Sequence, residues 1–258
     1  MTRIVVVGAM GRMGQMVRAA IARDPDLSLG GALERSGHPD LGRDVDGASL
    51  GDDPKLAIAG GDVVIDFSIP PSTLANLQVA ADLGVAYVTG TTGFDGEGLA
   101  KIREHAERIP IVHAPNFSLA VNVLAWLVRE AARKLGDDFD AELVELHHSA
   151  KRDAPSGTAL RLAEAVAAGR GQDASEHLLL ERAGDVGPRP DGAIAVQTLR
   201  GGDNPGEHTV LFIGRGERLE LAHRSATREH FATGAVRAAR WLVGREPGLY
   251  EIDDILGL

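Results

Sequence analysis

Short apolar runs rich in β-branched residues alternate with helical patterns through the first 116 residues of the chain. The strand candidates are Ile4–Val7, Leu27–Leu33, Val63–Phe67, Val85–Val88 and Ile111–His113. Helical patterns between most of them are Arg12–Arg23, Ser72–Leu83 and Glu97–Glu107. Strands that are separated by helices of about 10–15 residues form βαβ units, whose strands are parallel and whose helices cover both faces of the sheet. The alternation therefore predicts a doubly wound α/β domain.

The pattern changes after Asn116. A long apolar helix at Leu119–Leu135 is followed by an extended run at Phe139–Leu146 and by a helix that begins after Pro155 and ends at Gly169. A polar stretch, Arg170–Gly192, is expected to be a loop. Three strand-like runs without helices between them, and a final helix, complete the chain: Ala193–Leu199, Glu207–Ile213, Arg218–His223 and Arg228–Val243. Consecutive strands of this kind predict an α+β domain with an antiparallel or mixed sheet.

Composition narrows the kinds of chemistry that are open to this chain. Its 258 residues include 37 acidic and 27 basic side chains, for a net charge of −10, and no cysteine. Without cysteine there is no disulfide, thiolate nucleophile or thiolate metal site, so catalysis requires histidine, lysine, carboxylates or a cofactor. The acidic balance argues against nucleic acid as the main partner, and no apolar run is long enough to span a membrane. We expect a cytoplasmic protein that binds a small molecule.

A glycine-rich turn, Gly8-Ala9-Met10-Gly11-Arg12-Met13-Gly14, follows the first strand candidate. Glycines allow the backbone to approach a pyrophosphate closely, and N–H groups at the start of the next helix would bind that anion. The spacing G-x-x-G-x-x-G departs from the usual G-x-G-x-x-G, so the string alone is a weak signal. Glu34 strengthens it, because it ends the second strand candidate 20 residues after Gly14 and could accept hydrogen bonds from ribose hydroxyls.

Arg35, directly after Glu34, could bind a 2′-phosphate. This pair of residues predicts that both NADH and NADPH serve as cofactors. An ordinary solvated arginine is an equally good interpretation of Arg35.

Two loops follow later strand candidates, Gly90-Thr91-Thr92 and Ala114-Pro115-Asn116-Phe117. Ligands of doubly wound sheets bind beyond the carboxyl ends of the strands, so these loops are predicted to line the nicotinamide side of the cofactor site. Each loop taken alone is more typical of a plain turn.

The segment His147-His148-Ser149-Ala150-Lys151 follows the extended run that ends at Leu146. Neighbouring side chains on an extended segment point in opposite directions, so no metal site is predicted from the two histidines. Imidazole suits proton donation near neutral pH, and lysine supplies a compact cation for carboxylates. Lysine is rare in this chain, which makes Lys151 beside two histidines notable, although a solvated polar loop is an equal alternative. Ser156-Gly157-Thr158 then offers a helix N-terminus that could bind a carboxylate or be a plain N-cap.

These residues together resemble a known family. The motif is His147-His148-x-x-Lys151-x-Asp153-Ala154-Pro155-Ser156-Gly157-Thr158-Ala159, supported by Gly8–Gly14, Asp66-Phe67-Ser68, Gly90–Phe94, Asn116-Phe117-Ser118 and Gly206-Glu207-His208-Thr209. From Arg3 to the C-terminus the chain is similar to the dihydrodipicolinate reductases, also called 4-hydroxy-tetrahydrodipicolinate reductases. It departs from them at Ser149-Ala150, where many members carry basic or polar residues, so the charge around the substrate is expected to differ here.

The resemblance implies two domains and an assembly. Residues 1–118 and 228–258 would form a dinucleotide-binding domain, and residues 119–227 a substrate-binding and oligomerisation domain with an open mixed sheet. The open sheet would build a homotetramer. Closure of the two domains during the reaction would use hinges near Ser118 and Thr227.

The resemblance also implies a reaction in lysine and diaminopimelate biosynthesis. NADH or NADPH would reduce 4-hydroxy-tetrahydrodipicolinate (dihydrodipicolinate) to tetrahydrodipicolinate, with the proton given by His147. His148, Lys151, Gly157 and Thr158 would hold the substrate carboxylates, and Lys151 could share the proton donation.

Two alternative functions stay open on the sequence alone: another two-domain NAD(P) reductase that acts on a small acid, and a regulator that senses the nucleotide without turning it over. Short-chain dehydrogenases are excluded, because neither Tyr87 nor Tyr250 has a lysine four residues later. Semialdehyde dehydrogenases are excluded by the missing cysteine.

Overall fold

Strand β1 (Thr2–Val7) lies inside a mainly parallel sheet in the computed structural model, which describes all 258 residues. The strand order is β13-β7-β6-β5-β1-β2-β4-β3, and only the β3–β4 pair is antiparallel. The other strands of this sheet are β2 (Leu27–Leu33), β3 (Asp44–Val45), β4 (Ala48–Gly51), β5 (Val63–Asp66), β6 (Ala86–Thr89), β7 (Pro110–His113) and β13 (Gly248–Tyr250). The chain runs outward in one direction from β1 and in the other from β5, so the strand order reverses between these two strands.

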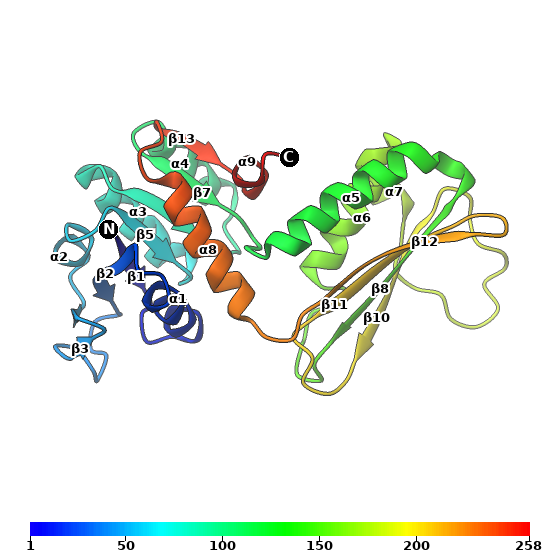
Figure 1. Cartoon of the computed structure of the whole chain (residues 1–258). Helices are drawn as coiled ribbons and strands as arrows, with labels where there is room; N and C mark the ends of the chain where they lie inside the picture. The colour runs from blue at the N-terminus through cyan, green and yellow to red at the C-terminus, as the bar shows by residue number, and fades with distance from the viewer. The chain divides into compact units, whose positions relative to one another are not determined.

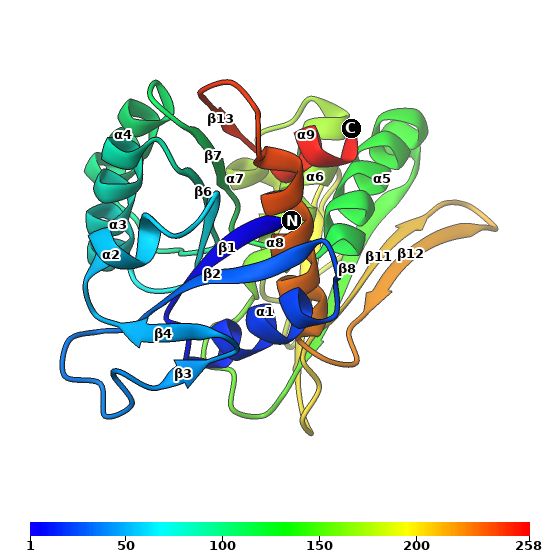
Figure 2. The ribbon, with the colours of Figure 1, turned by 60° about the vertical axis from the view of Figure 1, so that its left-hand side comes forward.

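Helices cover both faces of this sheet (Figure 2). On one face, α1 (Arg12–Ala22), α8 (Glu229–Leu242) and α9 (Ile252–Leu256) pack against alternate β1 residues such as Ile4 and Val6. On the other face, α2 (Pro54–Ile58), α3 (Pro70–Leu83) and α4 (Gly96–Ala106) pack against Val5 and Val7. All four β1 residues are buried, as expected for a parallel strand that is covered on both sides.

A second sheet has the order β12-β11-β8-β10-β9 (Figure 1). Its strands are β8 (Asp140–His147), β9 (Leu178–Leu179), β10 (Ile194–Arg200), β11 (Glu207–Ile213) and β12 (Arg218–Arg224). β8 pairs in parallel with β10 and antiparallel with β11, so the sheet is mixed. The helices α5 (Leu119–Leu135) and α6 (Gly157–Arg170) cover one face, and η1 (Gly136–Asp138) and α7 (Ala174–His177) are short. Leu199 and Ile213 alternate with the residues that face the helices, and both are exposed.

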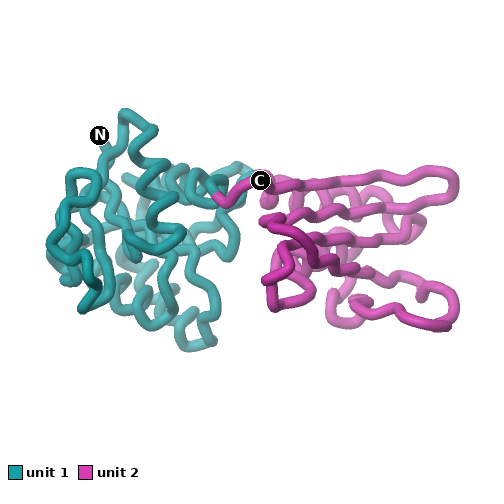
Figure 3. The backbone as a smooth tube through the Cα atoms, turned by 90° about the horizontal axis from the view of Figure 1, so that it is seen from below, with its two compact units in different colours: residues 1–119, 229–258 teal, residues 120–228 magenta.

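The chain separates into two compact units (Figure 3). One unit comprises Met1–Leu119 and Glu229–Leu258, because α8 returns the chain to the first sheet, and the other comprises Ala120–Arg228. The predicted fold class is confirmed: a doubly wound α/β unit is joined to an α+β unit with a mixed sheet. None of the helices has the length and apolar character that crossing a membrane requires.

The predicted end of one helix was wrong. α6 continues through Gly169 to Arg170, and the residue that ends it is Gly171, in the left-handed conformation at φ +69°. Gly169 serves packing instead, since a Cβ there would lie 2.3 Å from the carbonyl oxygen of Arg129 on α5.

The predicted loop Arg170–Gly192 also needs correction, because it contains α7 and β9. Like β3, β4, β13, α2 and α9, these elements are five residues or shorter. Such elements have too few residues to show a periodicity, and strand pairing or packing against neighbours stabilises them.

Candidate active site

The glycine-rich turn joins β1 to α1 at the edge of the first sheet where the strand order reverses. Gly8 has a left-handed φ of +66°, and its N–H donates to the carbonyl oxygen of Leu33 at 2.8 Å. A Cβ at Gly14 would lie 2.1 Å from the carbonyl oxygen of Gly8, so only glycine lets α1 pack this close to the turn. Ala9–Met13 thus run directly from the strand end into the first turn of α1, whose N–H groups can bind an anion.

Glu34 is held against this turn. Its Oε1 accepts a hydrogen bond from the Met10 N–H at 3.0 Å, and its Oε2 accepts one from the Arg35 N–H at 3.2 Å. The carboxylate is partly buried, whereas the Arg35 side chain is exposed. The structure therefore brings together Gly8, Met10, Glu34 and Arg35 as the sequence predicts.

A pocket of about 360 Å³ opens at this place. Its lining includes Gly8, Glu34 and Arg35, together with polar residues that sequence reasoning missed: Ser36, Asp52, Ser68, Ser72 and Asn76. Ser68 belongs to the Asp66-Phe67-Ser68 motif, which could have indicated it. Asp52 follows the short strand β4, which carries no pattern of its own.

The other predicted cofactor loops follow β6 and β7, on the same edge of the sheet. The side chains of Thr91, Ala114 and Phe117 are buried, and the Thr91 Oγ1 accepts a hydrogen bond from Thr73 at 2.8 Å. Phe117 packs edge-on against Phe67, with ring centroids 5.6 Å apart. These three side chains therefore shape the end of the sheet from inside, and a ligand could reach only their backbone groups.

Gly90 is required by the same packing. A Cβ there would lie 2.0 Å from the Phe67 ring. Two other residues of these loops, Thr92 and Pro115, are exposed. The Asn116 side chain accepts a hydrogen bond from the Ser118 N–H at 2.8 Å.

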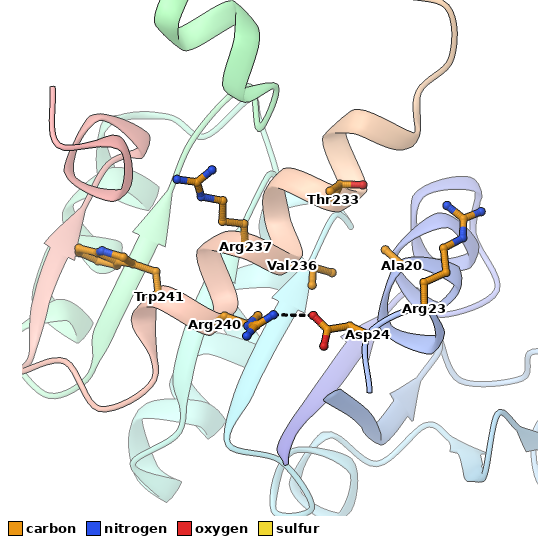
Figure 4. Close-up of a pocket in the computed structure, with 8 residues that line it drawn as sticks. All are labelled: Ala20, Arg23, Asp24, Thr233, Val236, Arg237, Arg240 and Trp241. Atoms are coloured by element: carbon orange, nitrogen blue, oxygen red, sulfur yellow. Dashed lines mark hydrogen bonds and ion pairs between the residues drawn. The ribbon is translucent and has the colours of Figure 1, made fainter. Parts of the chain in front are cut away.

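A larger hollow of about 550 Å³ lies between α1 and α8 (Figure 4). Two of its arginines are engaged in ion pairs, Arg23 with Glu229 at 3.0 Å and Arg240 with Asp24 at 2.6 Å. None of the residues around it is a predicted site residue. Asp24 stands just before β2, at the amino end of that strand, so this hollow lies away from the carboxyl ends where ligands of such folds bind.

In the second unit, the last residue of β8 is His147, which is nearly buried. Its Nδ1 lies 2.5 Å from the Oε2 of Glu145, and its ring packs edge-on against His208 with centroids 5.2 Å apart. Burial lowers the pKa of His147, while the Glu145 carboxylate opposes that change. Burial likewise lowers the pKa of His208, to about 4, so this second imidazole is neutral at physiological pH.

Glu145, Arg200 and His208 were not predicted as site residues. β8 alternates in burial, and Ala141, Leu143, Glu145 and His147 all face the interior. A carboxylate at an inward position two residues before His147 was the signal for Glu145. Arg200 comes from β10, and only the pairing of this strand with β8 reveals it. His208 comes from β11 and belongs to the Gly206–Thr209 motif, which could have indicated it.

Lys151 and His148 have different partners from His147. The Lys151 Nζ lies 2.8 and 2.9 Å from the two carboxylate oxygens of Asp153. The His148 Nε2 lies 3.4 Å from a nitrogen of Arg228. The hydrogen bond from Lys151 lowers the pKa of Asp153. No group of three or more histidine, aspartate or glutamate side chains is arranged to hold a metal ion.

The N-terminus of α6 lies beside this group. Ser156 caps the helix by accepting a hydrogen bond from the Ala159 N–H at 3.2 Å, and its own N–H donates to Glu145 at 3.0 Å. Gly157 is exposed and begins the helix, and Thr158 is half-buried. The structure thus brings His147 and the predicted anion-binding residues to one region through Glu145.

Comparisons with known proteins agree with these two halves. Residues 2–117 match the family model described as "Dihydrodipicolinate reductase, N-terminus", and residues 120–256 match "Dihydrodipicolinate reductase, C-terminus". The 4-hydroxy-tetrahydrodipicolinate reductase of an Anaeromyxobacter species is 50% identical over 266 residues, covering 100% of this chain and 98% of the relative. The reductase of the same name from Geobacter sulfurreducens is 48% identical, and the match covers 100% of this chain and 100% of the relative.

A solved structure shares the fold. The dipicolinate-bound dihydrodipicolinate reductase from a Paenisporosarcina species superposes with a TM-score of 0.77 at 24% identity, over 97% of each chain. An amine dehydrogenase from Mycobacterium smegmatis is more distant, with a TM-score of 0.59 and 15% identity over 98% of this chain and 95% of that one. The two family models span nearly the whole sequence, and relatives of the same name match it from end to end. The chain therefore belongs to the dihydrodipicolinate reductase family.

Proposed function

We propose that this protein reduces 4-hydroxy-tetrahydrodipicolinate to tetrahydrodipicolinate, at the expense of NADH or NADPH, in lysine and diaminopimelate biosynthesis. The observation that carries the proposal is the nearly buried His147, ion-paired with Glu145 beside Lys151 and the N-terminus of α6. A nucleotide-binding unit alone would fit many dehydrogenases. An acid next to two sites for carboxylates fits a reductase whose substrate is a dicarboxylate.

A dinucleotide fits the residues of the first unit. Gly14 lets α1 begin close to the turn, and the pocket beside Glu34 is lined by polar residues, among them Ser36, Ser68 and Asn76. The N–H groups of Arg12 and Met13, in the first turn of α1, would hold the pyrophosphate, and Glu34 or Arg35 the adenosine ribose or its 2′-phosphate. The loops Gly90–Thr92 and Ala114–Phe117 would hold the nicotinamide, chiefly through their backbone groups. The bound nicotinamide supplies the hydride.

His147 would supply the proton. The 4-hydroxyl of the substrate leaves as water, and the hydride adds to the unsaturated ring that results. This addition leaves negative charge on the neighbouring carbon, and a nearby acid whose pKa lies near the working pH can neutralise it. The Glu145 carboxylate stabilises the protonated imidazole, which keeps this acid available in a buried place.

Substrate carboxylates would bind at Lys151, His148 and the first residues of α6. The Lys151 ammonium donates hydrogen bonds to both carboxylate oxygens of Asp153, and it would bind a carboxylate of the substrate in the same way. The exposed residue Gly157 and the neighbouring Thr158, at the start of α6, would form a second carboxylate site at the helix N-terminus.

We infer further that the protein assembles as a homotetramer through the second sheet. Leu199 and Ile213 expose 50% and 38% of their surface on the face of this sheet that α5 and α6 leave uncovered. Light scattering of the eluting protein should give four times the chain mass of 27.1 kDa. The mass of a single chain would exclude the tetramer.

The test of the function is an absorbance assay of NADH and NADPH oxidation with substrate generated enzymatically. Oxidation that begins only when substrate is present supports the reductase. A flat trace with both cofactors, together with normal cofactor binding, would favour a nucleotide-sensing regulator.

A further inference from the structure

Glu145 is a carboxylate in the interior of the second unit. Its residue is 1% exposed, and it occupies an inward position of β8 next to the apolar positions Ala141 and Leu143. A buried carboxylate is unfavourable unless other groups compensate its charge and satisfy its oxygens. A hydrophobic residue would suit the packing of this strand better, so the carboxylate needs another explanation.

Every oxygen of Glu145 is satisfied by a neighbouring donor. Arg200 donates from both terminal nitrogens, at 2.8 Å to Oε2 and 3.0 Å to Oε1. Oε1 also accepts from the Ser156 N–H at 3.0 Å and from the Thr198 hydroxyl at 3.2 Å. These donors keep Glu145 ionised: burial raises its pKa, but the hydrogen bonds, led by those from Arg200, lower it by more.

An ionised carboxylate can only accept hydrogen bonds, so the proton between Glu145 and His147 belongs to the Nδ1 of the imidazole. The Nε2 has no hydrogen-bond partner in the protein. Gly206 leaves space beside this nitrogen, because a Cβ at position 206 would lie 2.8 Å from it. Nε2 is therefore the nitrogen from which His147 can give a proton.

The other titratable groups around His147 do not favour its protonated form. His208 on β11 is neutral, and Lys151 and Arg200 are cations that lower the pKa of His147. Glu145 is the anion in direct contact with the ring, and it raises that pKa.

We propose that Glu145 is a positioning residue of this enzyme: it fixes His147 with Nε2 available for proton donation and, through the Ser156 N–H, fixes the N-terminus of α6 in the same arrangement. One carboxylate thus links the proton donor to the carboxylate-binding helix. The inference rests on the proposed reductase activity, but its geometric part does not require turnover.

The first test observes the wild-type protein and leaves Glu145 in place. Nitrogen-15 NMR of the histidine rings distinguishes the two neutral tautomers, and the His147 signal can be assigned by its loss in His147→Gln. Above its pKa, His147 should carry its proton on Nδ1. A proton on Nε2 would overturn the proposal whether or not the protein reduces the proposed substrate.

The second test uses Glu145→Gln, which keeps the shape but removes the charge. The pKa of His147 should fall, so the protonated acid is lost at lower pH and the declining limb of the kcat–pH profile moves to lower pH. We expect kcat to fall by about 10²-fold, the lower end of what general acid catalysis contributes, with NADH affinity unchanged. Glu145→Asp keeps the charge and should retain more activity than Glu145→Gln.

Glu142→Gln is the matched control, because Glu142 lies on the same strand and is paired with Arg182 and Arg189 rather than with His147. It should leave the His147 pKa and the pH profile unchanged. The proposal fails if Glu145→Gln folds but leaves both the imidazole pKa and the pH profile as in the wild type. An inactive wild type with the predicted tautomer and the predicted pKa change would instead refute only the proposed reductase activity.

Discussion

His147 is the residue on which the proposed chemistry depends most. Replacing it by glutamine removes the acid and keeps a similar volume, so kcat should fall by about 10²–10⁴-fold. NADH affinity should not change, because the residues proposed for the cofactor belong to the other unit. Steady-state rates and calorimetric titration with NADH measure the two quantities. A near-normal kcat would assign the proton to Lys151 or to water.

Glu34 tests the choice of cofactor at the same scale. Glu34→Ala should weaken NADH binding more than NADPH binding. Only NADH has a free 2′-hydroxyl on its adenosine ribose, from which the carboxylate can accept a hydrogen bond. Both affinities should fall somewhat, since Glu34 also accepts from the Met10 N–H. Arg35→Ala should have the opposite preference. Calorimetric titrations that give equal losses for both cofactors in Glu34→Ala would contradict this role.

Single residues also show what a sequence can and cannot reveal about a site. His147, Lys151 and Gly157 lie within one short segment whose composition predicts their chemistry. Glu145 was recognisable only from the inward face of β8. Arg200 could not be assigned, because its proximity to Glu145 depends on the register of β10 with β8. His208 lies in a quoted motif, but its place beside His147 depends on the register of β11 with β8.

Among the elements, α6 has a proposed ligand-binding end and a packing role. Thr158→Val at its N-terminus keeps the shape but removes the hydroxyl. KM for the substrate should rise by an amount that corresponds to a charge-assisted hydrogen bond of about 1.5–3 kcal/mol, with cofactor affinity unchanged. Initial rates over a range of substrate concentrations decide this, and an unchanged KM would exclude the hydroxyl from substrate binding.

A substitution near the other end of α6 tests how closely this helix packs against α5. Gly169→Ala would place a Cβ 2.3 Å from the carbonyl oxygen of Arg129, so α5 and α6 must move apart. Overpacking of this kind typically costs about 1–3 kcal/mol, and the free energy of unfolding in urea should fall accordingly. Gly157→Ala in the same helix meets no atom within 4 Å and should change that free energy little. Equal stabilities of the two variants would show that the helices tolerate the added methyl group.

Elements were predictable where they carry an apolar pattern of their own, which includes the four-residue strands β5, β6 and β7. α5 and β2 begin and end where periodicity places them, since each carries a full apolar pattern. The three residues of β13 join the sheet only through β7, so their conformation depends on a neighbour that sequence reading could not supply. The misplaced end of α6 arose because two glycines lie two residues apart, and only the backbone shows which one is left-handed.

At the scale of the whole molecule, three features of the chain specify two units. Strands and helices alternate up to Asn116, the pattern changes after it, and the last long helix packs against the first sheet again. Each unit has its own apolar core, two layers of helices around the first sheet and one layer on the second. The first unit provides the turn and the acidic residue typical of dinucleotide binding, and the second provides the His147–Glu145 pair, Lys151 and the N-terminus of α6. This division predicts a reductase that binds a nucleotide with one unit and a small dicarboxylate with the other.

The most direct test of that claim follows the hydrogen itself. NADH that carries deuterium at both positions of nicotinamide C4 is incubated with the protein and freshly generated 4-hydroxy-tetrahydrodipicolinate, and the product is analysed by mass spectrometry. We predict tetrahydrodipicolinate that carries one deuterium on a ring carbon, formed in proportion to the NADH consumed. Product without deuterium, or NADH consumed without this product, would contradict hydride transfer to the ring and with it the proposed reaction.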